Sequence, residues 1–76
     1  MEKLYTKEIK EVGLKIKNLR ESKALTQQGL ADLCEVDIRT IQRIEKGEFG
    51  FGLHILFAIA EALGVKPGDL LKDIKL

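Results

Sequence analysis

The chain has 76 residues, enough for one small domain; 45% of them are hydrophobic but only 5% are aromatic. Its single cysteine excludes a disulfide within the chain and suits a reducing compartment, so we expect a cytoplasmic protein stabilised by helix packing. The net charge of +1 is small for a nucleic-acid-binding protein, but it does not exclude one, because the local charge distribution matters more than the total.

The first predicted helix follows a short N-terminal leader and begins after Thr6, a candidate N-cap. Apolar residues recur along it at steps of three and four, which places them on one buried face. The other face is rich in lysine and is interpreted as solvated surface; the alternative is that one or two lysines, such as Lys15, reach phosphates. The buried stripe is Ile9, Val12, Ile16 and Leu19, and the lysines are Lys7, Lys10, Lys15 and Lys17.

Two short helices joined by a tight turn are predicted within residues 25–47. Thr26 is a candidate N-cap for the first of them, whose buried stripe is Leu30, Ala31 and Cys34. Because Cys34 falls on that stripe, we interpret it as a packed thiol rather than a nucleophile or redox sensor.

The second of these helices follows Asp37, another N-cap candidate, and stops at Gly47. Ile41 and Ile44 form its apolar back, while its front carries side chains suited to reading bases and binding phosphates. The outward positions are Ile38, Arg39, Thr40, Gln42, Arg43 and Lys46. Two short helices with this division of faces look like a helix-turn-helix.

A glycine-rich loop occupies residues 48–52, after the helix pair. A nucleotide-binding phosphate loop would need a strand before it and a Lys-Ser/Thr pair after it, and this loop has neither. We expect its two aromatic residues, Phe49 and Phe51, to pack under the loop or at a dimer contact.

The helix predicted over Leu53–Leu63 is apolar on more than one face and ends at Gly64. Its surplus apolar side chains exceed what a domain of this size buries alone, so we predict a homodimer interface here. Pro67 then starts a predicted fifth helix, in which Leu70 and Leu71 close the core. The inward stripe is Leu56, Ile59, Ala60 and Leu63, and the surplus residues are Leu53, Ile55, Phe57 and Ala58.

No pattern in the chain indicates an enzyme, a metal site or a small-molecule cofactor. The only histidine, His54, and the only cysteine, Cys34, lie in different predicted helices, so the spacing of metal ligands is missing. No apolar run matches a signal peptide or a membrane span. We therefore expect no catalysis, no cofactor and no membrane association.

The helix pair and its flanks are similar to the phage repressor and Cro-type helix-turn-helix family of bacterial transcription regulators, and to the restriction–modification controller proteins among them. The resemblance implies an all-α, compact five-helix lambda-repressor-like DNA-binding domain over residues 9–71, between a leader (1–8) and a tail (72–76). The helix-turn-helix is formed by the second and third helices. Matching positions are Leu25, Thr26, Gln27, Leu30, Ala31, Val36, Ile41, Ile44, Glu45 and Gly47, with Gly13, Ile16, Leu19 and Arg20 before them and Leu56, Ile59, Ala60, Leu63, Gly64, Val65, Leu70 and Leu71 after them.

The resemblance also implies a structural role for two charged residues. Arg20 and Glu45 match the positions of an ion pair that ties the first helix to the third. Two positions depart from the family pattern. Glu35 stands where the family usually has a left-handed glycine, at a cost of about 1 kcal/mol, and Gly29 replaces the Glu or Gln that would complete a capping box with Thr26.

We therefore expect a sequence-specific regulator of transcription that binds double-stranded DNA as a homodimer of repressor type, with the third helix in the major groove. The alternative is a protein-interaction module or antitoxin-type subunit with the same fold and little DNA affinity of its own. Arg39 and Arg43 are expected to read guanine or contact phosphate, and Gln42 is a candidate for adenine. The expected DNA-binding residues are Gln27, Gln28, Ile38, Arg39, Thr40, Gln42, Arg43 and Lys46.

Overall fold

Four α-helices and one 3-10 turn make up the regular structure of residues 4–48 and 50–76, the part of the chain that the computed structural model describes. The helices are α1 (Thr6–Ser22), α2 (Gln27–Cys34), α3 (Ile38–Lys46) and α4 (Leu53–Leu63), and the turn is η1 (Pro67–Leu70). The predicted all-α class is confirmed, with α2 and α3 as the two helices of the helix-turn-helix.

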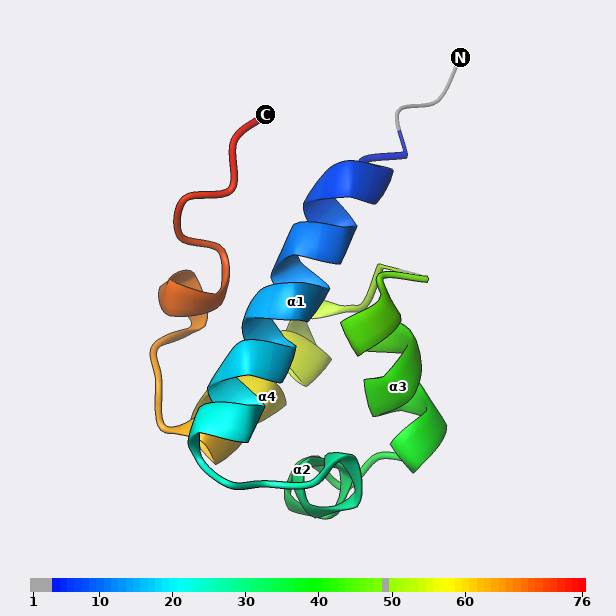
Figure 1. Ribbon diagram of the computed structural model, residues 1–76, viewed down its shortest axis with the longest axis vertical. Coiled ribbons are helices and arrows are strands. Elements are labelled where there is room, and N and C mark those ends of the chain that lie inside the picture. The colour runs from blue at the N-terminus through cyan, green and yellow to red at the C-terminus, as the bar shows by residue number, and fades with distance from the viewer. Residues whose placement is uncertain (1–3, 49) are drawn as a thin grey trace.

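The helices are arranged around α1, which has α3 on one side and η1 with the C-terminal segment on the other (Figure 1). α2 packs against both α3 and α4 and closes one end of the domain. The α1–α3 contact is backbone to backbone at Gly13, where an added Cβ would lie 3.2 Å from the backbone oxygen of Glu45 and nearer still to that of Ile44. Glycine at this position therefore lets the two helices approach closely.

The core lies where the inward faces of α1 to α4 and η1 meet. The stripes predicted for the three later helices are all buried, and Cys34 is buried with them as a packed thiol. In α1, by contrast, Ile16 is fully buried while Val12 and Leu19 are half-buried at the edge of the core. The buried apolar residues are Ile16, Leu30, Ala31, Cys34, Ile41, Ile44, Leu56, Ile59, Ala60, Leu63 and Leu70.

The predicted fifth α-helix is wrong, because the chain forms only the single 3-10 turn η1 there. Pro67 occupies its first position as expected, but four residues that include Gly68 do not sustain an α-helix. Leu70 is fully buried, whereas Leu71 is 48% exposed and does not close the core. Leu71, directly after the turn, instead lines an apolar cavity together with residues of α1 and α4.

The N-terminal end of α1 also differs from its prediction. Thr6 is the first helical residue and not its cap; the N-cap position is occupied by Tyr5, in the left-handed conformation with φ 52° and without a side-chain hydrogen bond. Residues 6–8, placed in the leader by the sequence, thus belong to α1. In the described part of the chain, the helices are too short or too polar to cross a membrane.

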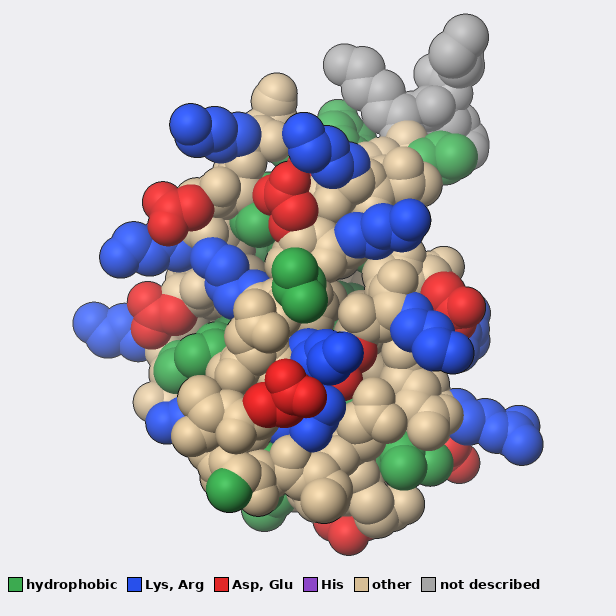
Figure 2. Space-filling model, viewed as in Figure 1, with side chains coloured by type: hydrophobic (Ala, Val, Ile, Leu, Met, Phe, Trp, Pro, Cys, Tyr) green, Lys and Arg blue, Asp and Glu red, His purple; other side chains and the backbone are tan. Residues whose placement is uncertain are grey.

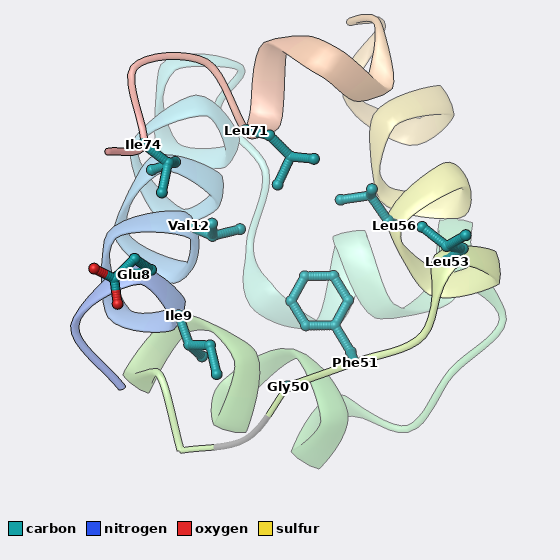
Figure 3. A pocket seen from close by; sticks show the side chains of 9 residues that line it. All are labelled: Glu8, Ile9, Val12, Gly50, Phe51, Leu53, Leu56, Leu71 and Ile74. Carbon is teal, nitrogen blue, oxygen red and sulfur yellow. The ribbon is translucent and has the colours of Figure 1, made fainter. Parts of the chain in front are cut away.

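An apolar cavity of about 290 Å³ lies under the loop between α3 and α4. Its walls come from α1, the loop, α4 and the C-terminal segment, and the ring of Phe51 points into it (Figure 3). Phe51 is half-buried and packs against the core, which confirms that it packs under the loop. The prediction for Phe49 lies outside the described residues.

Candidate nucleic-acid interface

The short helix α2 is set by local hydrogen bonds at its two ends. The Oγ1 of Thr26 accepts a hydrogen bond from the backbone N–H of Gly29 at 2.9 Å, which confirms the predicted N-cap. The helix ends at Glu35, which is left-handed with φ 56°. The position at which the resembled family usually has glycine is therefore occupied by a residue that is strained there, as the resemblance implied.

The helix α3 is bounded in the same way and carries the candidate reading face. The Oδ1 of Asp37 accepts a hydrogen bond from the N–H of Arg39 at 2.8 Å, and the helix ends at Gly47 with φ 71°. Ile41 and Ile44 are buried and hold α3 on the core. The opposite face of α3 is consequently turned outward at a fixed angle.

The most exposed side chains of α3 are three cations spaced along one ridge. Arg39, Arg43 and Lys46 are all exposed and lie at positions i, i+4 and i+7, on one side of the helix. Thr40 and Gln42 are half-buried beside them. We define the cationic ridge as Arg39, Arg43 and Lys46.

The dimensions of an α-helix suit the groove that α3 is expected to enter. A helix with its side chains is about 10 to 12 Å in diameter, and the major groove of B-DNA is about 12 Å wide. Ile38, expected to touch a thymine methyl group, is half-buried and packs in part against the core.

The two glutamines at the start of α2 make intramolecular hydrogen bonds that the sequence did not predict. The Nε2 of Gln27 donates to the Oε1 of Glu45 at 3.0 Å, and the Nε2 of Gln28 donates to the Oδ1 of Asp32 at 2.8 Å. Because a carboxylate only accepts, these contacts fix the orientation of both amide groups. Gln27 is half-buried and Gln28 is exposed.

A buried ion pair supports the interface from behind. The Nε of Arg20 donates to the Oε2 of Glu45 at 2.7 Å and its Nη2 donates to the Oε1 at 3.1 Å, which confirms the predicted pair between α1 and α3. The Nη1 of Arg20 also donates to the backbone oxygen of Leu25 at 2.7 Å. The hydrogen bond to Glu45 is the largest influence on Arg20 and raises the pKa of its guanidinium, against the opposing effect of burial.

Two lysines of α1 have different surroundings. Lys15 donates to the backbone oxygen of Lys72, so this candidate phosphate ligand is engaged with the C-terminal segment. Lys10 instead contacts Gly47, where α3 ends. Sequence reasoning missed this second contact, since nothing in the spacing of residues within α1 reveals which lysine meets α3.

The charges around the helix-turn-helix balance one another. Exposed acids interrupt the basic residues, and the face in Figure 2 likewise shows Lys and Arg interspersed with Asp and Glu. The low net charge of the chain therefore extends to the candidate interface. Within residues 27–47, the exposed acids are Asp32, Glu35 and Asp37, and the exposed cations are Arg39, Arg43 and Lys46.

A capped helix pair of this kind, with one helix supported from behind by the core and turned outward, defines a DNA-binding protein of the helix-turn-helix class. The family model described as helix-turn-helix matches residues 16–70. The chain belongs to this helix-turn-helix family.

The relatives are regulatory proteins. The chain is 38% identical over 60 residues to control protein C.BamHI of Bacillus amyloliquefaciens, covering 78% of this chain and 74% of that protein. It is 41% identical over 56 residues to an uncharacterized HTH-type transcriptional regulator of Methanocaldococcus jannaschii, covering 74% and 85%. The crystal structure of the restriction-modification controller protein C.AhdI from Aeromonas hydrophila superposes with a TM-score of 0.80, at 29% identity and coverages of 82% and 94%. The protein is thus a DNA-binding regulator of transcription.

Proposed function

We propose that the protein regulates transcription as a homodimer of repressor type, in which each protomer reads one half-site of a duplex with α3 in the major groove. The observation that carries this proposal is the cationic ridge on the exposed face of a capped helix that the core holds from behind. The similarity to two controller proteins supports genes of restriction and modification as the regulated targets.

Arg39 and Arg43 are the proposed base-reading residues, because guanidinium groups make bidentate contacts with guanine in the major groove. Lys46, in the last turn of α3, is proposed to contact a phosphate. The balanced charge of the surface favours an interface in which the two arginines read bases and Lys46 binds a phosphate. With few excess cations, non-specific attraction to phosphates is weak and discrimination depends on base contacts.

Gln27 and Gln28 are proposed to contact the DNA backbone and not the bases. Each amide is held by a carboxylate within the protein, so one N–H of each is already committed. Their remaining N–H groups are proposed to approach the DNA backbone near the start of α2, where unpaired helix amides also favour a phosphate. Thr40 and Gln42, half-buried beside the ridge, are proposed to contact the groove wall.

The reading face is tested by selecting bound sequences from a random duplex pool and titrating the recovered duplex. Arg39→Ala and Arg43→Ala should each weaken specific binding by about 1 to 3 kcal/mol and relax the preference at particular base pairs. Arg39→Lys retains the charge but not the bidentate geometry, so it should lose specificity and keep the dependence on salt. Unchanged affinity in the Arg39/Arg43 double mutant would refute the assignment.

The proposed dimer interface is the outer face of α4. Leu53 and Phe57 lie one turn apart on it and are 67% and 53% exposed, and Leu71, directly after η1, is 48% exposed. Ile55 and Ala58, also predicted as surplus, are half-buried against the core and contribute less. Fully burying a large apolar side chain is worth roughly 1.5 to 3 kcal/mol, and a twofold axis doubles each contribution.

Sedimentation at micromolar concentration should give twice the monomer mass, and Phe57→Glu should shift it toward the monomer. Leu33→Glu is the matched control, since Leu33 is 58% exposed but lies on α2 rather than α4. A monomeric wild type, or an equal effect of both substitutions, would contradict an interface on α4.

A further inference from the structure

Lys10 is the α1 lysine that the fold brings to the end of the recognition helix. A Cβ added to Gly47 would lie 2.7 Å from the Cα of Lys10 and 3.0 Å from its Cβ, so the two residues are in direct contact. Gly47 is the C-cap of α3, directly after Lys46. Two lysines from different helices therefore flank the same end of α3.

Lys10 lies on α1, next to the end of the cationic ridge. The ridge ends at Lys46 in the last turn of α3. The aliphatic part of the Lys10 side chain contacts Gly47, the residue that follows Lys46. The side chain of Lys10 is exposed, and among residues 4–48 and 50–76 no carboxylate lies within ion-pair distance of its ammonium group. Lys15, five residues further along α1, is by contrast occupied by the backbone oxygen of Lys72.

The proposed docking of α3 directs this end away from the bases. Recognition helices contact bases mainly through their N-terminal residues, so the C-terminal end of α3 is the end nearer to the sugar–phosphate backbone. A flexible ammonium group suits a phosphate, because as a point charge it needs no bidentate geometry.

We propose that Lys10 binds a phosphate at the rim of the major groove, so that the interface includes α1 as well as the helix-turn-helix. This inference rests on the proposed docking of α3. A different role is available to Lys10, because a cation near the C-terminal end of a helix also interacts favourably with its exposed carbonyl groups. In that case Lys10 would stabilise the fold and leave DNA binding unchanged.

The salt dependence of DNA affinity separates these two roles. The wild type, Lys10→Gln, Lys10→Arg and Lys72→Gln are titrated with the duplex recovered by selection, between 50 and about 200 mM salt, a range over which phosphate contacts dominate the change in affinity. Lys72 is the control, because the segment after η1 lies on the other side of α1 from α3 (Figure 1). Urea unfolding of each variant checks that the fold is retained.

Lys10→Gln should reduce the slope of log K against log salt by about 0.9 for each protomer bound. The loss of affinity should be similar for the selected duplex and for its single-base variants, since a phosphate contact carries no sequence preference. Lys10→Arg should restore the slope, and Lys72→Gln should not change it.

A slope equal to that of the wild type in Lys10→Gln would overturn the inference, whether or not the variant is less stable. That result would leave the proposed function standing, because the wild type would still bind. Absence of salt-dependent DNA binding by the wild type would overturn both the phosphate contact of Lys10 and the proposed function.

Discussion

Replacing Glu45 by glutamine is expected to destabilise the fold by about 3 to 5 kcal/mol, because the buried charge of Arg20 then keeps only the exposed Glu21, 4.0 Å away, as a counter-ion. The side chains of Arg20 and Glu45 are only 8% and 3% exposed, and they share two hydrogen bonds. Glutamine keeps the size of the side chain, so the change removes the charge and one acceptor without creating a cavity. The hydrogen bond that Glu45 accepts from Gln27 is weakened as well.

This loss is large for a domain whose total stability is expected to be about 5 to 15 kcal/mol. At about 4 to 8 °C for each kcal/mol, a loss of 3 kcal/mol lowers the melting temperature by roughly 12 to 24 °C. Urea unfolding measures it directly as a lower midpoint with an unchanged slope. The double variant Arg20→Met/Glu45→Leu should recover most of the loss, since neither charge then remains buried.

The loss of stability in Glu45→Gln should also be independent of pH across the neutral range. The pKa of Arg20 is raised in the folded state, so its contribution is fully present below the unfolded pKa and is lost only as the pH rises through the folded value, far above neutrality. A Glu45→Gln variant within 1 kcal/mol of the wild type would refute the claim that the pair is a buried structural element.

Two further effects follow from the geometry of α2. Glu35→Gly should raise the free energy of unfolding by about 1 kcal/mol, because glycine adopts the left-handed conformation of the turn without strain; a lower urea midpoint would contradict this. Burial raises the pKa of the Cys34 thiol, so the native state keeps its proton at a pH where the unfolded state ionises. Stability should therefore fall as the pH rises above about 8.5, the ordinary value for cysteine, and a Cys34→Ala variant should lack that part of the decline.

The local elements of this fold were predictable because short-range hydrogen bonds decide them. Thr26 and Asp37 cap the helices that follow them, and Gly47 and Gly64 end the helices before them, as their positions in the sequence indicated. Capping and left-handed termination involve residues within about four positions of each other, so the sequence holds all the information that they need. The C-terminal limit of α4 was predicted correctly for this reason.

The resemblance supplied one long-range contact that the residues by themselves did not reveal. Arg20 and Glu45 are 25 positions apart, and their pairing was inferred from matching family positions rather than from periodicity. The same reasoning was less successful at the C-terminal end. A fifth helix was expected after Pro67, but the single turn η1 formed there, because a four-residue segment has too few backbone hydrogen bonds to propagate an α-helix.

Within this protein, the sequence by itself determined the helix pair and the charged front of α3, through caps and apolar periodicity. The tertiary structure alone decided the surroundings of the side chains on and beside that surface. It tied Gln27 to Glu45, packed part of Ile38 against the core and placed Lys10 beside Gly47. These contacts depend on how α1, α2 and α3 cross, and the crossing is set by backbone contact and core packing between residues far apart in the chain, which no local pattern encodes.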